Sequence, residues 1–150
     1  MPPRAPETSR CPIAVALDVF GDRWTLLVIR DLLFKGKRHY REFLESHEGI
    51  ATNILADRLA RLEAEGLVSK TLDPHHGRRR VYALTRKGYD LIPVILEMIE
   101  WSARHYPQGG SGALVVGAPA DLRQRLRGDR AGLIAEIEDR ANTVARGKGP

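Results

Sequence analysis

The 150-residue sequence has one cysteine, few aromatic residues and no long apolar run. A lone cysteine cannot form a disulfide within the chain and excludes a structural zinc site built from cysteines. No apolar stretch approaches the ~20 residues that span a bilayer. The first residues, MPPRAPETSR, lack the apolar segment of a secretory signal. We therefore expect a cytoplasmic protein with no membrane partner.

Motifs of catalysis and metal binding are also missing. His47 and Glu48 lack the second histidine of an H-E-x-x-H helix, and His75 and His76 are adjacent in an expected turn. Neither the P-loop motif G-x-x-x-x-G-K-[ST] nor the dinucleotide motif G-x-G-x-x-G occurs. We expect no catalytic residues, no metal and no cofactor, and an enzyme is the least favoured class of function.

Positive charge is in excess. Lys and Arg number 24 against 19 Asp and Glu, and 43% of residues are hydrophobic, a value typical of a globular protein. The length suits one domain with a short appendage. The charge balance favours a polyanionic partner such as nucleic acid.

The hydrophobic pattern predicts several helices and one hairpin. Helices are expected over residues 12–20, 23–34, 40–44 and 51–65, with Asp22 as an N-cap and Gly66 as a C-terminal stop. Residues 67–72 and 79–84 alternate like strands on either side of a turn at 73–77. Thr85 is expected to cap one helix over residues 86–105, which is apolar on nearly every side.

This order of elements is that of a winged helix-turn-helix, mainly α-helical with a β-hairpin wing, in which the helix at 51–65 enters a DNA major groove. Leu55, Leu59 and Leu62 form its core face. Polar side chains suited to reading base edges lie on the other side: Thr52, Asn53, Asp57 and Arg61. Asp57 either accepts from cytosine or orients Arg61. The alternative is an ordinary solvated helix face.

Two clusters of cations accompany this helix. Arg78, Arg79 and Arg80 lie beside the hairpin tip, and Lys35, Lys37 and Arg38 precede the helix-turn-helix. Clustered cations suit phosphate contact. The alternative for the arginines is a charged edge strand that guards against aggregation.

From about residue 11 to residue 101 the sequence resembles the HxlR-type winged-helix transcriptional regulators of bacteria. The matching pieces are Cys11-Pro12, Gly21-Asp22-Arg23-Trp24, Phe43, Ile50, Ile54-Leu55, Leu59, Leu62-Glu63-Ala64-Glu65-Gly66-Leu67-Val68, Tyr82-Ala83-Leu84-Thr85, Gly88 and Trp101. The resemblance implies a homodimer, joined largely through terminal helices, on a pseudo-palindromic operator. It implies control of transcription with either sign.

The resemblance also gives roles to particular residues. A dimer interface would explain the over-apolar helix, and we assign to it Leu91, Ile95, Met98, Ile99 and Trp101. In some members the cysteine matching Cys11 senses oxidants or electrophiles, commonly with a second cysteine that this chain lacks. The routes left to Cys11 are a Cys11–Cys11 link, a mixed disulfide with a small thiol, or alkylation.

We divide the chain into a flexible tail (1–10), a winged helix-turn-helix DNA-binding and dimerisation domain (11–106), a Gly/Pro-rich linker (107–120) and a C-terminal amphipathic helical extension (121–150). The extension either packs as a helix, enlarging the dimer or lining an effector pocket, or stays largely mobile. The leading hypothesis is a dimeric, sequence-specific transcriptional regulator that responds to redox, electrophile or small-molecule signals. The alternative is a winged-helix protein-interaction module without sequence-specific DNA binding.

Overall fold

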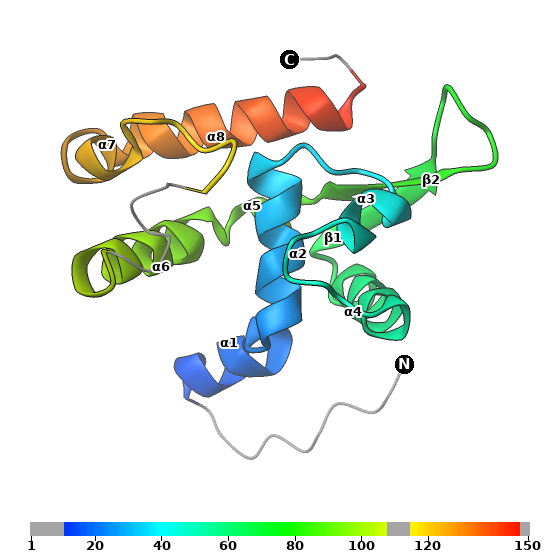
Figure 1. Cartoon of the computed structure of the whole chain (residues 1–150), viewed down its shortest axis with the longest axis horizontal. Helices are drawn as coiled ribbons and strands as arrows, with labels where there is room; N and C mark the ends of the chain where they lie inside the picture. The colour runs from blue at the N-terminus through cyan, green and yellow to red at the C-terminus, as the bar shows by residue number, and fades with distance from the viewer. Residues whose placement is uncertain (1–10, 108–114, 148–150) are drawn as a thin grey trace.

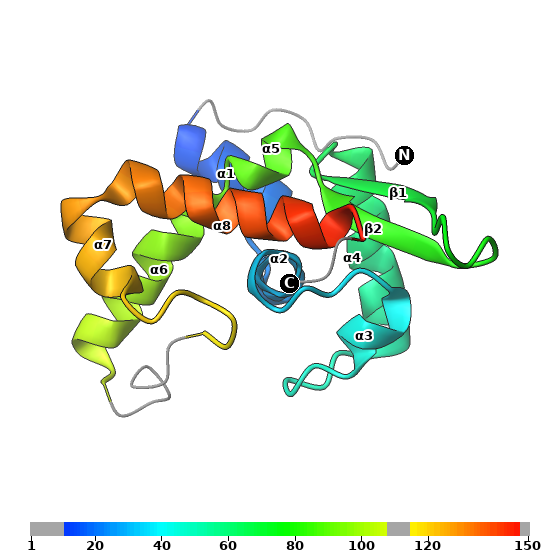
Figure 2. The ribbon, with the colours of Figure 1, turned by 90° about the horizontal axis from the view of Figure 1, so that it is seen from above.

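The computed structural model describes residues 11–107 and 115–147. These residues are mainly helical with one β-hairpin, so the predicted fold class is confirmed (Figures 1 and 2). The elements are, in chain order, α1 (Pro12–Phe20), α2 (Arg23–Phe34), α3 (Tyr40–Leu44), α4 (Thr52–Ala64), β1 (Val68–Leu72), β2 (Arg80–Leu84), α5 (Arg86–Tyr89), α6 (Ile92–His105), α7 (Leu122–Gly128) and α8 (Arg130–Ala145).

Helix α2 forms the centre of the molecule. Asp22 caps it as predicted, because its Oδ1 accepts from the backbone N–H of Trp24 at 2.9 Å and of Thr25 at 3.3 Å. In Figure 1, α4 and the hairpin lie on one side of α2, α6 lies on the other, and α8 crosses its C-terminal end. Most of α2 is therefore buried, including Val28, Ile29 and Leu32.

Helices α3 and α4 with the hairpin form the winged helix-turn-helix. Gly66 ends α4 at φ +74°, where the N–H of Leu67 donates to Leu62 O and that of Gly66 donates to Glu63 O. This is a Schellman motif, which favours glycine because of the positive φ. Strands β1 and β2 then pair antiparallel, with Val68 opposite Leu84 and Leu72 opposite Arg80.

The prediction of one helix over residues 86–105 is wrong. The structure has two helices, α5 and α6, which are separated at Asp90 and Leu91. Pro93 has no N–H to donate to Tyr89 O, so a continuous helix would lose a hydrogen bond and clash there. The break lets α6 leave α5 in a new direction.

The C-terminal extension also forms two helices instead of one amphipathic segment. Asp129 ends α7 and caps α8, because its Oδ1 accepts from Gly132 N at 3.0 Å. The apolar side chains of both helices are buried: Leu122, Leu126, Leu133, Ile137 and Ala141. Helix α8 packs on α2 and β2, so the extension shares the core of the preceding elements. None of the described helices is long and apolar enough to cross a membrane.

Candidate nucleic-acid interface

Helix α4 has one buried and one exposed face. Leu55, Leu59 and Leu62 are at most 2% exposed and hold the helix on the core. The four residues predicted to read bases are all exposed: Thr52, Asn53, Asp57 and Arg61. The start of α4 is also tied to α3, because the Tyr40 hydroxyl donates to Thr52 O at 2.7 Å.

Of the two roles considered for Asp57, the pairing with Arg61 is not present among the described residues. The Asp57 carboxylate instead binds the neighbouring Arg58, whose Nε also lies 3.0 Å from Asp22 Oδ2 at the start of α2. Arg58 therefore joins α4 to the cap of α2. The Arg61 side chain has no ion pair with a described residue, which leaves it available to an external acceptor.

The wing presents exposed cations close to α3. Arg78, Arg79 and Arg80 are all exposed. An open groove of about 680 Å³ between the hairpin and α3 is lined by Arg79, Arg80, Arg41 and Lys70, together with His39, Tyr40, Glu42, Glu45 and Tyr82. Lys70 was missed at the sequence level, although the alternation of β1 places it on the same face as Tyr82 opposite.

Two of the residues predicted to bind DNA phosphates, Lys35 and Lys37, contact the carboxylate of Asp31. Lys37 Nζ lies 2.9 Å from Asp31 Oδ2 and 2.6 Å from Ser46 Oγ, and Lys35 Nζ lies 3.8 Å from Asp31 Oδ1. Asp31 is only 2% exposed. We use the name Asp31 network for the cluster of Asp31, Arg30, Lys35, Lys37, Ser46 and Glu48. A buried carboxylate needs such partners, so Lys37 chiefly neutralises Asp31.

Arg30 completes this network. Its Nη2 lies 2.7 Å from Asp31 Oδ1, and its Nη1 binds Glu48. The hydrogen bond from Arg30 lowers the pKa of Glu48 to about 2. The network joins the end of α2 to the segment between α3 and α4, so it fixes where α4 stands.

A second polar link joins α3 to the wing. The ring of His39 lies between two carboxylates, with Nδ1 2.6 Å from Glu42 Oε1 and Nε2 2.8 Å from Asp73 Oδ2. The hydrogen bond with His39 lowers the pKa of Asp73 to about 2. Next to it, Arg38 O accepts from Tyr82 N at 2.8 Å. Arg38, the third residue of its predicted cluster, is only partly exposed, and its backbone carbonyl holds β2.

Exposed apolar side chains gather away from the wing. Val94 is 37% exposed, Met98 48% and Trp101 57% on α6, and α1 has no buried residue although Ile13 and Leu17 are apolar. Of the residues assigned to a dimer interface, Met98 and Trp101 are exposed and Ile99 is half-buried. Leu91, just before α6, and Ile95 within it are instead buried in the chain's own core at 8% and 6% exposure.

Cys11 is the N-cap residue of α1 and is exposed. It therefore lies at the start of the apolar helix α1, far along the chain from the wing. Within the described part of the chain, no three His, Cys, Asp or Glu side chains converge as metal ligands would.

Comparison with known proteins gives a consistent picture. The model of the family described as HxlR-like helix-turn-helix matches residues 19–109. The HTH-type transcriptional regulator sll1512 of Synechocystis is 35% identical over 88 residues, which cover 59% of this chain and 64% of the relative. The chain thus spans less than two thirds of that relative's length. The HTH-type transcriptional regulator YodB of Bacillus subtilis is 33% identical over 93 residues, covering 61% of this chain and 82% of YodB.

Solved structures agree with these sequence matches. The reduced form of the transcriptional regulator YodB from B. subtilis superposes with a TM-score of 0.55 at 30% identity, covering 67% of this chain and 99% of that one. The oxidized form of the redox regulator HypR superposes with a TM-score of 0.57 at 30% identity, covering 63% of this chain and 97% of that one. Helices α7 and α8 lie beyond the residues that the family model matches.

Proposed function

Because this chain belongs to the HxlR-like helix-turn-helix family, we propose that it is a sequence-specific, DNA-binding regulator of transcription that acts in the cytoplasm and is not an enzyme. The observation that carries the proposal is the exposed face of α4. Thr52, Asn53, Asp57 and Arg61 face outward there, while buried leucines hold the helix on the core. An exposed helix of this kind, beside a basic wing, can enter the major groove.

Base reading and phosphate binding fall to different elements in this proposal. On α4, Asn53 can bond adenine and Arg61 guanine through paired hydrogen bonds. Arg78, Arg79 and Arg80 on the wing, with Arg41 and Lys70 beside them, supply the phosphate contacts. Lys35 and Lys37 add positive potential to the interface but keep their contacts in the Asp31 network.

The proposed regulator is a homodimer on a pseudo-palindromic operator. The exposed apolar side chains of α1 and α6 support this, because water-exposed Ile13, Met98 and Trp101 would be covered by a second copy. A two-fold dimer presents two α4 helices to half-sites about one turn of DNA apart.

We further propose that Cys11 makes the regulator responsive to oxidants or electrophiles. Support comes from its exposure at the N-cap of α1 and from the description of HypR as a redox regulator. Modification there would alter the helix that we place in the dimer interface. Treatment with a quinone should weaken operator binding of the wild type and leave that of Cys11→Ser unchanged. Equal responses of both proteins would remove Cys11 from this role.

The decisive test is fluorescence anisotropy of the full chain on DNA from its own upstream region and on a scrambled duplex, across a salt series. We expect a preference of at least about 10³-fold at physiological salt. No preference for any upstream fragment or genomically selected sequence would contradict the proposal and favour docking of the basic surface on an acidic protein.

A further inference from the structure

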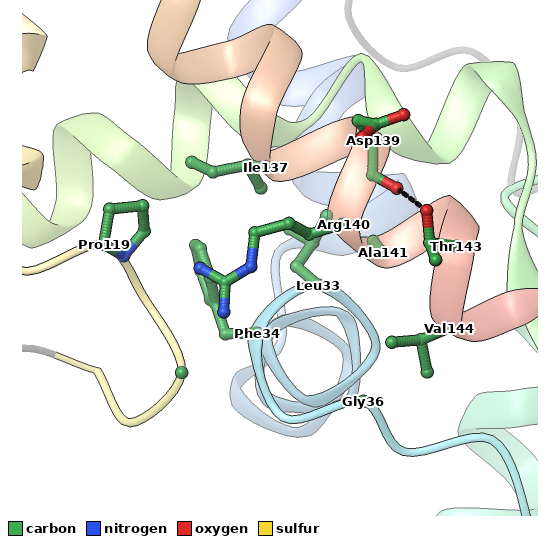
Figure 3. Close-up of a pocket in the computed structure, with 11 residues that line it drawn as sticks. Leu33, Phe34, Gly36, Pro119, Ile137, Asp139, Arg140, Ala141, Thr143 and Val144 are labelled. Carbon is green, nitrogen blue, oxygen red and sulfur yellow. Dashed lines mark hydrogen bonds between the residues drawn. The ribbon is translucent and has the colours of Figure 1, made fainter. Parts of the chain in front are cut away.

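A pocket of about 350 Å³ lies where α8 crosses the end of α2 (Figure 3). Leu33 and Phe34 of α2 and Ile137 and Ala141 of α8 form its apolar wall, and all of them are buried. The remaining lining residues are Gly36, Gly117, Pro119, Asp139, Arg140, Thr143 and Val144. This volume is within the range of small-molecule sites, about 300–1,000 Å³.

The connection before α7 closes one side of the pocket. Gly117 lies against the last turn of α2 at φ +89°, and a Cβ there would stand 1.8 Å from Phe34 O. Only glycine fits this approach. The pocket is therefore made jointly by the helix-turn-helix domain, the connection before α7 and the C-terminal extension, and eight of its eleven lining residues lie outside the residues of the family match.

Arg140 gives this pocket a charge. In Figure 3 its side chain extends from α8 toward Phe34 and Pro119, whereas the Asp139 carboxylate points away from that end. Arg140 forms no ion pair with a described residue. Arg123 and Arg127 of the extension, by contrast, both bind Glu100. Arg140 is the cation among the residues that line the pocket.

We propose that this pocket binds a small carboxylic acid with an apolar body. The body lies against Phe34 and Ile137, and the carboxylate binds the guanidinium of Arg140. Arginine suits this task because its planar group offers a carboxylate two parallel hydrogen bonds. The apolar wall supplies the free energy of burial, and the single cation selects acids over neutral compounds of the same shape.

The position of the pocket gives the ligand a route to the DNA-binding elements, and this part rests on the proposed function. Leu33, Phe34 and Gly36 border the pocket, and the Asp31 network begins in the same segment. That network holds the connection between α3 and α4 through Ser46 and Glu48. Gly147, just after α8, lies beside the side chains of Arg38 and His75. A ligand that moves α8 on α2 would therefore shift α4 and the wing.

The site is tested by NMR titration of the isotope-labelled full chain, without DNA. The probes are hexanoate, octanoate, benzoate, 3-phenylpropanoate and 1-naphthoate, each compared with its primary amide. We expect at least one acid to shift the amide signals around Phe34, Gly117 and Ala141, and its amide to bind about tenfold more weakly or worse. No acid that shifts these signals, or acids and amides of equal affinity, would overturn the proposal.

Matched variants test whether the carboxylate of the ligand binds Arg140. Arg140→Gln should weaken acid binding about tenfold and leave amide binding unchanged, whereas Arg146→Gln removes the same charge outside the pocket and should have no effect. Val144→Phe should abolish binding of acid and amide alike by filling the space, with the circular dichroism spectrum unchanged. Undiminished acid binding in Arg140→Gln would contradict the assignment.

A second arm measures DNA affinity with and without the best acid. A change in operator affinity that Arg140→Gln removes supports the regulatory role, and unchanged affinity at saturating acid overturns that role alone. Absence of specific DNA binding counts against the proposed function instead. The titration contains no DNA, so it still decides whether the pocket binds acids.

Discussion

At the scale of single residues, the proposed interface separates side chains that read bases from side chains that bind phosphate. Asn53→Ala should weaken operator binding by about 1–3 kcal/mol and leave binding to nonspecific DNA unchanged, because only base contacts are lost. Arg79→Ala should weaken binding to both DNAs and make the salt dependence shallower. Anisotropy on the two duplexes measures both effects. Equal losses on both duplexes for Asn53→Ala would remove it from the base-reading set.

Asp31 is the buried carboxylate of the network that joins the end of α2 to the segment before α4. Asp31→Asn keeps the shape of the side chain but removes the charge that Arg30 and Lys37 share. We expect a loss of about 2–3 kcal/mol in the free energy of unfolding, below the ~3–5 kcal/mol of a fully buried pair because the cations are partly exposed. Chemical denaturation measures it. Asp57→Asn, on an exposed carboxylate, is the control and should change stability by less than about 0.5 kcal/mol. Equal effects of the two substitutions would show that the network does not hold the fold.

At the scale of elements, α8 is the helix that most changes the expected domain. It packs on α2 and β2 through Leu133 at 0% and Ile137 at 2% exposure. Because these side chains are buried, α8 is part of the core. The sequence left open whether the extension packs as a helix or stays mobile, and the structure shows residues 130–145 packed as a helix.

The packing of α8 predicts both protection and stability. Amide hydrogens from Leu133 to Ile137 should exchange slowly, because a packed helix opens only with its core. Leu133→Ala should cost about 2–5 kcal/mol, the usual range for a buried leucine. Hydrogen exchange and thermal unfolding measure the two quantities, with the exposed Ala131→Gly in the same helix as a control at about 1 kcal/mol. Rapid exchange of this stretch would contradict the packing seen here.

At the scale of the whole molecule, exposed apolar residues on α1 and α6 predict self-association. The wild type should be a dimer by light scattering at micromolar concentration, and Met98→Asp should be a folded monomer because a charge would be buried at the interface. Val116→Asp is the matched control, since Val116 is apolar and 74% exposed but lies outside α1 and α6. A dimer that survives Met98→Asp would place the interface elsewhere.

Acid stability is another property of the whole molecule. The pKa values of Glu48, Asp73 and Glu100 are each lowered to about 2, by hydrogen bonds from Arg30, from His39, and from Arg123 and Arg127 respectively. Their ordinary values are 4.5, 3.8 and 4.5. A lowered folded pKa stabilises the fold above the ordinary value and ceases to do so as pH falls through the lowered value.

The free energy of unfolding should therefore fall as the pH drops from about 4.5 to about 2. Denaturation at a series of pH values measures this. Glu100→Gln should make the fall shallower, because one of the three carboxylates no longer titrates. A free energy of unfolding that increases as the pH drops from about 4.5 to about 2 would contradict these ion pairs.

The sequence by itself determined the order of elements as far as the hairpin, and the faces of α4. The leucine spacing of α4, the cap at Asp22 and the glycine at Gly66 are local signals, and each acts through neighbouring residues of the chain. The exposed Thr52, Asn53 and Asp57 follow from the same periodicity. The missed break before α6 was also local, since Pro93 alone accounts for it.

Only the tertiary structure decided which charges are free and where the extension packs. Lys37 and Arg61 are equally basic in the sequence, yet one neutralises buried Asp31 and the other has no described partner. In the sequence, Arg140 is one of several cations on a helix. In the tertiary structure α8 lies across the end of α2, and this brings Arg140 beside Phe34 in the pocket. These outcomes depend on contacts between segments far apart in the chain, and helical periodicity reports only which side of a helix faces inward, not what it meets there.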